Sequence, residues 1–251
     1  MRVLLTNDDG ISSKGLEALT KAFQRIAEVT VVAPEGEKSG AGHSITVMEP
    51  LRVTRYVKKG NFFGYAVNGT PADCVKLSLK ALLKKLPHLV VSGINPGLNT
   101  GTNVLYSGTV SAATEATLLG LPALAVSLQD NGKRQHFEVA ARYAVKVALQ
   151  VKKNGLPKGI LLNINVPNLT LKKIKGIAIT RQGVFKYTDF YEKRFDPRRR
   201  AYYWLTAEKL KLTEAEDSDM RAIENCQVSV TPLHYDMTRY EFISNLKKWE
   251  I

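Results

Sequence analysis

The chain has 251 residues, 44% of them hydrophobic and 24% charged, which is the composition of a globular protein with a sizeable core. No apolar run approaches the roughly 18 residues of a membrane span, no signal segment precedes the first strand, and the only cysteines, Cys74 and Cys226, lie far apart. We therefore expect a cytoplasmic protein without membrane contact, disulfide scaffold or zinc site. The net charge of +13 is spread evenly along the chain: residues 1–150 contain 17 basic and 11 acidic residues, and residues 151–251 contain 19 and 12. This even distribution argues against a basic tail that binds nucleic acid. The positive charge would still attract anionic phosphates.

The first apolar run ends in an amide, two adjacent carboxylates and a glycine. Residues 3–6 predict a strand buried on both faces. Asn7, Asp8 and Asp9 would then lie at its carboxyl end, where open parallel sheets bind ligands. Adjacent carboxylates repel each other, and a hard divalent cation such as Mg²⁺ or Mn²⁺ relieves that repulsion. The alternative is that both aspartates only turn the chain and cap the helix that starts near Ser13.

An amphipathic helix should return the chain to a second strand at 29–33, which makes a right-handed βαβ unit. The loop that follows, residues 35–44, is rich in glycine and charge, and it should emerge at the same edge as the acidic pair. Within it, His43 could contact the phosphate or the leaving group of a substrate. A histidine in such a loop is as often a solvated side chain, so both interpretations stay open.

A hairpin at 51–67 and a helix that starts at Thr70 precede a third buried strand at 89–91. The glycine-rich loop after that strand contains Asn95 and Asn99. Amide oxygens are neutral metal ligands and amide nitrogens are phosphate donors, although asparagine and glycine are also common in tight turns. The loop would reach the edge that already holds the acidic pair, which favours the ligand interpretation.

Residues 106–111 open a helix that continues to about residue 119. The amino terminus of a helix has unpaired amide groups and a partial positive charge, and Gly108 would let an anion approach the backbone closely. Ser107 and Thr109 can add hydroxyl donors to such a phosphate site. The alternative is that Ser107 is an ordinary helix cap. A strand at 123–127 follows.

Beyond residue 130 we expect a helix at 135–152, strands at 159–166 and 176–180, and an arm or hairpin in 181–205 that packs on a partner subunit. Three arginines at 198–200 beside aromatic residues at 202–204 could bind nucleic acid, but a solvated charged loop is favoured. Asp217 and Asp219 could be a second metal pair, although capping of the following helix is favoured.

Five motifs in the first half of the chain occur in a recognisable order: residues 7–10 (NDDG), 39–44 (SGAGHS), 69–74 (GTPADC), 92–101 (SGINPGLNTG) and 107–111 (SGTVS). Together they resemble the SurE (survival protein E) family of metal-dependent phosphatases. Later stretches agree more loosely. The sequence departs from the family at Arg199 and at Cys226-Gln227, where a glycine and Gly-Tyr are usual, and at Thr206-Ala207, where a glycine often follows the leucine.

The resemblance implies a Rossmann-like, three-layer α/β core with a mostly parallel sheet. Residues 1–130 would form the catalytic core, and 131–251 would add the rest of the core and a smaller C-terminal segment with a β-hairpin arm, all in one structural unit. It also implies a homodimer, with dimers that could pair into tetramers.

The implied activity is the hydrolysis of nucleoside 5′-monophosphates, with 3′-monophosphates and short polyphosphate as further substrates. One divalent ion per subunit, Mg²⁺ or Mn²⁺, would be held by Asp8, Asp9, Ser39 and Asn95. From the residues, either aspartate, with Asp8 preferred, could accept a proton from a metal-activated water. The phosphate contacts expected from the patterns and the resemblance are Asn7, His43, Asn99, Ser107, Gly108 and Thr109, with Ser107 and Asn95 also expected to act in catalysis.

Three other classes of protein place similar residues at such sites. A phosphoacceptor receiver domain needs an aspartate after its third strand and a lysine after its fifth, and neither is evident. A haloacid-dehalogenase phosphatase would want Asp-x-Asp in place of Asp8-Asp9. A nonenzymatic nucleotide or nucleic-acid binding protein would use the net charge and would show steep salt dependence.

Overall fold

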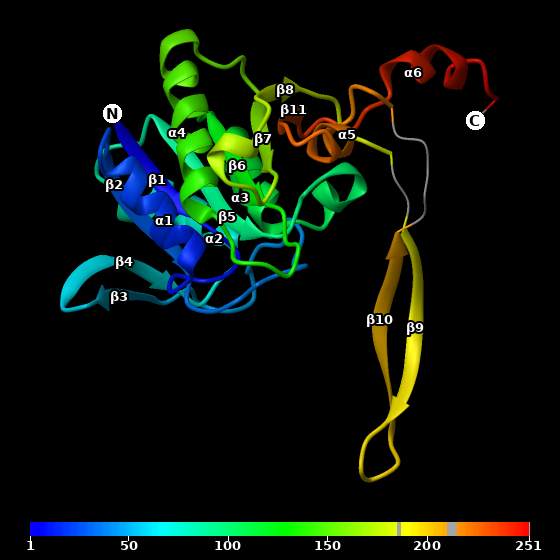
Figure 1. The fold of residues 1–251 in the computed structure, drawn as a ribbon, viewed down its shortest axis with the longest axis horizontal. Coiled ribbons are helices and arrows are strands. Elements are labelled where there is room, and N and C mark those ends of the chain that lie inside the picture. The colour runs from blue at the N-terminus through cyan, green and yellow to red at the C-terminus, as the bar shows by residue number, and fades with distance from the viewer. Residues whose placement is uncertain (185–186, 210–214, 251) are drawn as a thin grey trace.

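The computed structural model describes residues 1–184, 187–209 and 215–250. Its centre is a mostly parallel sheet of nine described strands in the order β3-β4-β2-β1-β5-β6-β7-β11-β8. The strands are β1 (Arg2–Thr6), β2 (Glu28–Pro34), β3 (Val53–Lys58), β4 (Asn61–Val67), β5 (Leu89–Pro96), β6 (Ala123–Leu128), β7 (Ile160–Val166), β8 (Ile177–Ile179) and β11 (Val228–His234). Figure 1 shows helices on both faces of this sheet, so the predicted three-layer α/β fold is confirmed.

The main helices are α1 (Lys14–Phe23), α2 (Pro71–Leu77), α3 (Gly108–Leu118) and α4 (Phe137–Asn154), and α5 (Asp219–Glu224) and α6 (Tyr240–Leu246) are short. A π-turn (Ser78–Leu82) continues α2, and 3₁₀ turns lie at Gly101–Leu105 and Leu171–Lys173. The buried side chains form two clusters. Val3 and Leu5 of β1 pack with residues of α1 and α4, whereas Leu4 packs with residues of α2 and α3. Strand β1 is therefore covered on both faces, as its apolar run predicts.

The strands and helices expected from the sequence occur in the expected order, with one informative difference. We predict a strand at 89–91 followed by a loop, but β5 runs to Pro96 and pairs with β6, with a register shift between Gly93 and Asn95. A Cβ atom at Gly93 would lie 2.3 Å from the carbonyl oxygen of Val126. Only glycine fits such a close approach, so a residue that looks like a loop signal belongs to the sheet.

Residues on both sides of position 130 share this sheet, because β7, β11 and β8 extend it beyond β6. This arrangement agrees with one structural unit, and the division at residue 130 stays a prediction. No helix in the described ranges is long and apolar enough to cross a membrane. The cytoplasmic location also stays a prediction.

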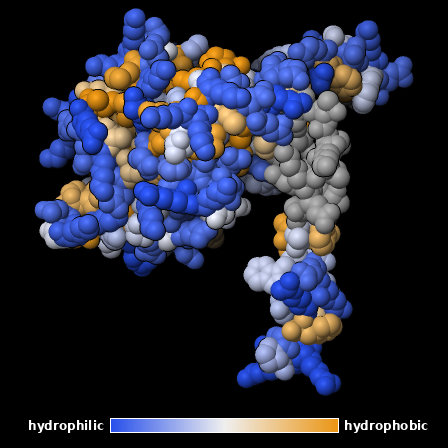
Figure 2. Space-filling view, viewed as in Figure 1, coloured by the Kyte–Doolittle hydropathy of each residue, from blue (hydrophilic) through white to orange (hydrophobic). Residues whose placement is uncertain are grey.

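A long hairpin of β9 (Tyr187–Phe195) and β10 (Ala201–Lys209) projects away from the core (Figure 1). It is the arm that the composition of 181–205 predicts. Large apolar and aromatic side chains on it are exposed in the single chain: Phe190, Tyr191, Phe195, Tyr203, Trp204 and Leu205. Figure 2 shows orange, hydrophobic residues on the hairpin among blue, hydrophilic ones. At the tip, Arg199 has a φ of 59°.

Candidate active site

Asp8 lies directly after β1 and is only 3% exposed. Its carboxylate accepts hydrogen bonds from the hydroxyl and from the backbone N–H of Thr109, at the start of α3. A Cβ atom at Gly108 would lie 2.9 Å from the Cβ atom of Asp8. Gly108 thus lets the helix approach Asp8, so the amino terminus of α3 holds this carboxylate before any ligand binds.

Asp9 is the less satisfied member of the acidic pair. Its Oδ2 is buried and has no hydrogen-bond partner in the described structure. Burial, and then the negative charges of Asp8 and Glu37, raise the pKa of Asp9 to about 7, and burial also raises the pKa of Asp8. Raised pKa values mean that the negative charge of the pair is poorly compensated, and a divalent cation supplies the missing compensation.

Asn7 supports the turn that follows β1. Its Nδ2 donates to the carbonyl oxygen of Gly10 at 3.0 Å and to Ser13 Oγ at 2.8 Å. Ser13 is the N-cap of α1, because its Oγ accepts from the N–H of Leu16. The Oδ1 of Asn7 is buried without a described partner, so this oxygen, rather than the amide nitrogen, is the atom left for a ligand.

Ser39 lies on the glycine-rich loop, residues 35–44, which packs against the acidic pair. The N–H of Lys38 donates to the carbonyl oxygen of Asp8 at 2.7 Å, and the N–H of Gly42 donates to that of Tyr106 at 3.1 Å. Ser39 is exposed, and its hydroxyl donates to Glu37 Oε1 at 2.8 Å. The loop therefore brings Ser39 to the edge that carries Asp8, as the order of the motifs predicts.

Asn95 is the penultimate residue of β5, the strand next to β1, which pairs with β1 up to Ser92 opposite Thr6. Its Nδ2 donates to the carbonyl oxygen of Gly97 at 2.9 Å, which leaves Oδ1 as the ligand atom. A Cβ atom at Gly15 would lie 2.1 Å from the carbonyl oxygen of Ile94. Helix α1 therefore presses directly on this end of β5 and fixes the backbone beside Asn95.

Together these groups fit a hard cation. Asp8, Asp9, Ser39 and Asn95 present only oxygen ligands at one edge of the sheet, which suits Mg²⁺ or Mn²⁺ rather than zinc. No group of three or more histidine, cysteine or acidic side chains is poised for metal in the ranges that the structure describes. The candidate metal site thus rests on two carboxylates and two neutral oxygens rather than on such a cluster.

The side chain and backbone of Asn99 are hydrogen-bonded within the protein. Its Nδ2 donates to Ser127 Oγ at 2.8 Å, and its backbone exchanges hydrogen bonds with Asn163 and Asn165 of β7. Its proposed contact with phosphate stays a prediction. Sequence reasoning missed Asn163 and Asn165, although two asparagines at alternate positions of a buried apolar strand are an unusual pattern that needs partners.

Ser107 is the N-cap of α3, as the alternative interpretation has it. Its Oγ accepts from the N–H of Val110 at 3.1 Å, and its carbonyl oxygen accepts from Ser111 Oγ at 2.7 Å. Because Thr109 is engaged by Asp8, the N–H of Gly108 is the group of this turn best placed for a phosphate. The roles of Ser107, Gly108 and Thr109 toward phosphate stay predictions.

His43 contacts a buried carboxylate that sequence reasoning also missed. Its Nε2 lies 2.9 Å from Oε2 of Glu115, in the middle of α3. The other oxygen of Glu115 accepts from Lys76 Nζ at 3.1 Å. Lys76, on α2, is half-exposed and therefore joins a buried carboxylate to the surface of the protein. A single glutamate among small and apolar helix residues was the available signal.

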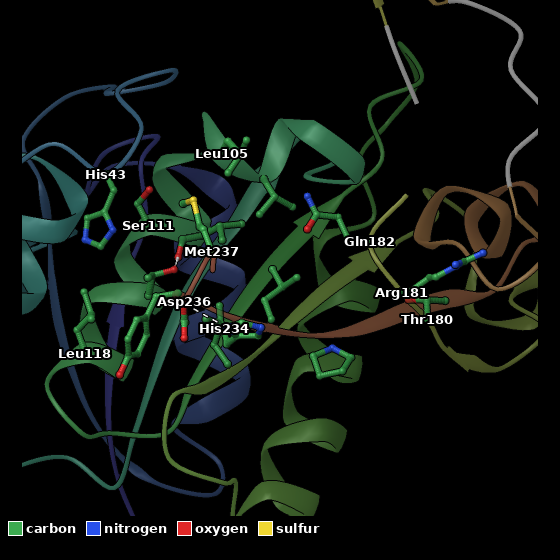
Figure 3. A pocket seen from close by; sticks show the side chains of 17 residues that line it. His43, Leu105, Ser111, Leu118, Thr180, Arg181, Gln182, His234, Asp236 and Met237 are labelled. Carbon is green, nitrogen blue, oxygen red and sulfur yellow. Dashed lines mark hydrogen bonds between the residues drawn. The ribbon is translucent and has the colours of Figure 1, made fainter. Parts of the chain in front are cut away.

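A cavity of about 660 Å³ lies along α3. Its lining includes His43 and, from the first turns of that helix, Val110 and Ser111, but none of the four proposed metal ligands. Figure 3 shows His43 and Ser111 on one side and Gln182 across from them. Its size is within the range of small-molecule pockets, about 300 to 1,000 Å³, and its lining mixes apolar and polar groups.

Asp219 is not one half of a second metal pair. Ser218 caps α5, and the buried carboxylate of Asp219 accepts backbone N–H bonds from Gly101 at 2.9 Å and Gly183 at 3.1 Å. Asp217 is exposed and pairs with Arg181 at 2.7 Å. The two side chains therefore make separate structural contacts, and the helix cap is Ser218, which lies between them in the sequence.

The comparisons with known proteins agree with this geometry. Residues 3–189 match the family model described as Survival protein SurE. A protein named 5′-nucleotidase SurE from Syntrophobacter fumaroxidans is 48% identical over 251 residues, covering all of both chains. The protein of the same name from Syntrophus aciditrophicus is 50% identical over 248 residues, covering 98% of this chain and 93% of the relative.

Among solved structures, the crystal structure of the SurE protein from Aquifex aeolicus is similar to this chain over almost its whole length. The TM-score is 0.86 at 42% sequence identity, and the match covers 98% of each chain. The likeness therefore includes the hairpin and C-terminal elements as well as the sheet.

Proposed function

Because the chain belongs to the survival protein SurE family, we propose that it is a 5′-nucleotidase, which hydrolyses a nucleoside monophosphate to nucleoside and phosphate. The observation that carries this proposal is the acidic pair at the end of β1: Asp8 is buried against the amino terminus of α3, and Oδ2 of Asp9 is buried without a described partner. A nonenzymatic binding role has no support from the relatives, which are named as nucleotidases.

The site would hold one Mg²⁺ or Mn²⁺ ion through Asp8, Asp9, Ser39 and Asn95. When bound, such an ion polarises the phosphoryl group and lowers the pKa of a water molecule, which provides a nucleophile near neutral pH. Of the two aspartates, Asp9 is better placed to accept the proton of the water. Its Oδ2 has no described partner, whereas Asp8 accepts two bonds from Thr109.

The remaining residues bind and orient the substrate. The N–H of Gly108, at the positive end of α3, meets the negative charge of the phosphate. Thr109 fixes Asp8, and Asn7 fixes the turn between the acidic pair and α1. The cavity along α3 takes the nucleoside, since its lining reaches Val110 and Ser111 in the first turns of the helix and combines apolar surface with a few polar groups.

The β9–β10 hairpin serves self-association rather than catalysis. Its exposed aromatic side chains are typical of a surface that is covered by another protein chain. A homodimer is the simplest assembly for such an arm, and pairing of dimers would give a tetramer. Activity on 3′-monophosphates and on short polyphosphate belongs to the same proposal, because the phosphate site itself selects no nucleoside.

The test is phosphate release from a panel of nucleoside 5′- and 3′-monophosphates, first in EDTA and then with Mg²⁺ or Mn²⁺. Asp8→Asn and Asp9→Asn should each lower kcat by about a thousandfold or more, because they remove charge at the reacting centre. Asp217→Asn is the matched control, since this exposed aspartate pairs only with Arg181 among described residues. No release from any nucleotide by the folded wild-type protein, with either metal, would refute the proposal.

A further inference from the structure

The carboxylate of Glu115 is buried in the middle of α3 and takes no part in the proposed chemistry. It is 4% exposed. Burial of a charge is costly unless ionic or hydrogen-bonding partners compensate it. Glu115 has two such partners, His43 Nε2 at 2.9 Å and Lys76 Nζ at 3.1 Å. The two oxygens of the carboxylate are therefore each held by a different side chain.

These two partners connect Glu115 to different parts of the chain. Lys76 lies on α2, the neighbouring helix, and its side chain is 48% exposed. His43 lies at the end of the glycine-rich loop, four residues after Ser39. The Glu115–His43 contact thus ties that loop to α3, the helix whose first turn holds Asp8.

The glycine-rich loop depends on such contacts for its shape. Gly40 and Gly42 have φ values of 72° and 57°, a region that glycine enters freely. The side chain of Ser39 bonds only to Glu37 of the same loop among the described contacts. Backbone hydrogen bonds from Lys38 to Asp8 and from Gly42 to Tyr106 fix the loop on each side of Ser39. The contact of His43 with Glu115 adds a side-chain anchor directly after the second.

We propose that Glu115 is a positioning residue for the metal site. By holding His43, it sets the glycine-rich loop in the conformation that keeps Ser39 beside Asp8 and Asp9. This inference rests on the proposed function, because it assumes that a divalent cation binds at Ser39 and the acidic pair. Residues that orient metal ligands typically change metal affinity by about 10- to 100-fold when they are removed.

The test measures Mn²⁺ binding directly, by titration calorimetry and by the electron paramagnetic resonance signal of free Mn²⁺, without substrate. Glu115→Ala and His43→Ala should each weaken Mn²⁺ binding about tenfold. The double variant should bind Mn²⁺ no more weakly than either single variant, because each single variant already removes the Glu115–His43 contact. Glu115→Gln, which keeps an acceptor oxygen, should recover part of the affinity.

Lys76→Met is the matched control, because it removes the other partner of Glu115 and leaves the loop anchor in place. It should lower the melting temperature in EDTA while Mn²⁺ affinity stays within about twofold. Steady-state kinetics at saturating Mn²⁺ should show near wild-type kcat for Glu115→Gln, which a direct catalytic role would not allow.

The inference is overturned if wild-type protein binds Mn²⁺ and folded Glu115→Ala or His43→Ala binds it equally well. It is also overturned if Lys76→Met weakens binding as much as Glu115→Ala, since the effect would then be a general loss of packing. Absence of Mn²⁺ binding by the wild type is a different failure, which refutes the proposed metal site itself. If Glu115→Ala does not fold, Glu115→Gln and His43→Ala decide the question.

Discussion

At the carboxyl end of β1, Asp8 is buried and accepts two hydrogen bonds from Thr109, whereas on the hairpin Tyr203 and Trp204 are 57% and 59% exposed. The edge of the sheet satisfies most of its polar groups within one chain and leaves open the oxygens that a cation would use. The hairpin leaves apolar surface open instead. The single chain therefore contains every residue of the proposed metal site, whereas the exposed apolar surface of the arm is of the kind that the proposed self-association would cover.

The largest expected effect is on the pH dependence of stability without metal, and it should come from the charge on Asp9. Its pKa is raised to about 7 in the folded protein, against about 4 in an unfolded chain, so the folded state binds more protons between these pH values. The free energy of unfolding should therefore fall as pH rises from 4 to 7, by up to about 4 kcal/mol, and stay low above pH 7. Denaturant unfolding in EDTA across this range measures it.

Asp9→Asn should flatten this pH dependence, because the variant has no carboxyl group to titrate at this position. Added Mg²⁺ or Mn²⁺ should raise the stability of the wild type most at the upper end of the range. An equal pH dependence for wild type and Asp9→Asn would show that the buried charge is compensated in some other way.

A smaller effect is expected at Thr109, which connects the acidic pair to α3. Thr109→Val keeps the shape of the side chain and removes the hydroxyl that Asp8 uses, so kcat should fall by about 10- to 100-fold with little loss of fold. Thr117→Val on the same helix is the control, since its hydroxyl donates only to the carbonyl oxygen of Ala113. Equal kinetics for the two variants would remove Thr109 from the active site.

A gain in the free energy of unfolding of about 1 kcal/mol or less is expected when glycine is placed at two positions where the chain departs from its family. Arg199 and Cys226, which replace usual glycines, both have a φ of 59°, a backbone region that costs about 1 to 2 kcal/mol for residues with a Cβ atom. Arg199→Gly and Cys226→Gly should each raise the melting temperature slightly, because part of this gain is offset by the flexibility of glycine in the unfolded chain. Lys59→Gly, at φ 50° in the β3–β4 turn, provides a third comparison by thermal denaturation.

The smallest effect on the stability of the core should come from changes in the hairpin. Tyr203→Ser combined with Trp204→Ser removes exposed aromatic surface, so the free energy of unfolding of the core should change by less than about 0.5 kcal/mol. Sedimentation should nonetheless show weaker self-association. Unchanged association at micromolar concentration would mean that these two aromatics face no partner.

The order of strands and helices follows from local patterns, because apolar runs such as residues 3–6 and 123–127 are buried over their whole length. The position of Ser39, Asn95 and the acidic pair at one edge also follows, since parallel strands end together. The Asp8–Thr109 and His43–Glu115 contacts could not be predicted in this way. Their partners are 101 and 72 residues apart, and only packing of α3 against the sheet decides which side chains meet.

The extension of β5 shows a second limit of sequence patterns. Glycine, asparagine and proline at 93–96 are typical of a turn, yet contact with β6 keeps these residues in the sheet. Asn99 shows a third limit, since an amide in a glycine-rich loop looks the same whether it binds a ligand or, as in this structure, Ser127.

Asp219, in the last part of the chain, supports loops that lie far from it in the sequence. Its buried carboxylate is the acceptor for Gly101, in the turn that leads into α3, and for Gly183, just before the hairpin. A protein truncated before α5 would retain every proposed metal ligand, yet two buried N–H groups would lose their acceptor. A fragment that ends before α5 should therefore unfold at a lower temperature than the whole chain, because unpaired buried N–H groups are destabilising.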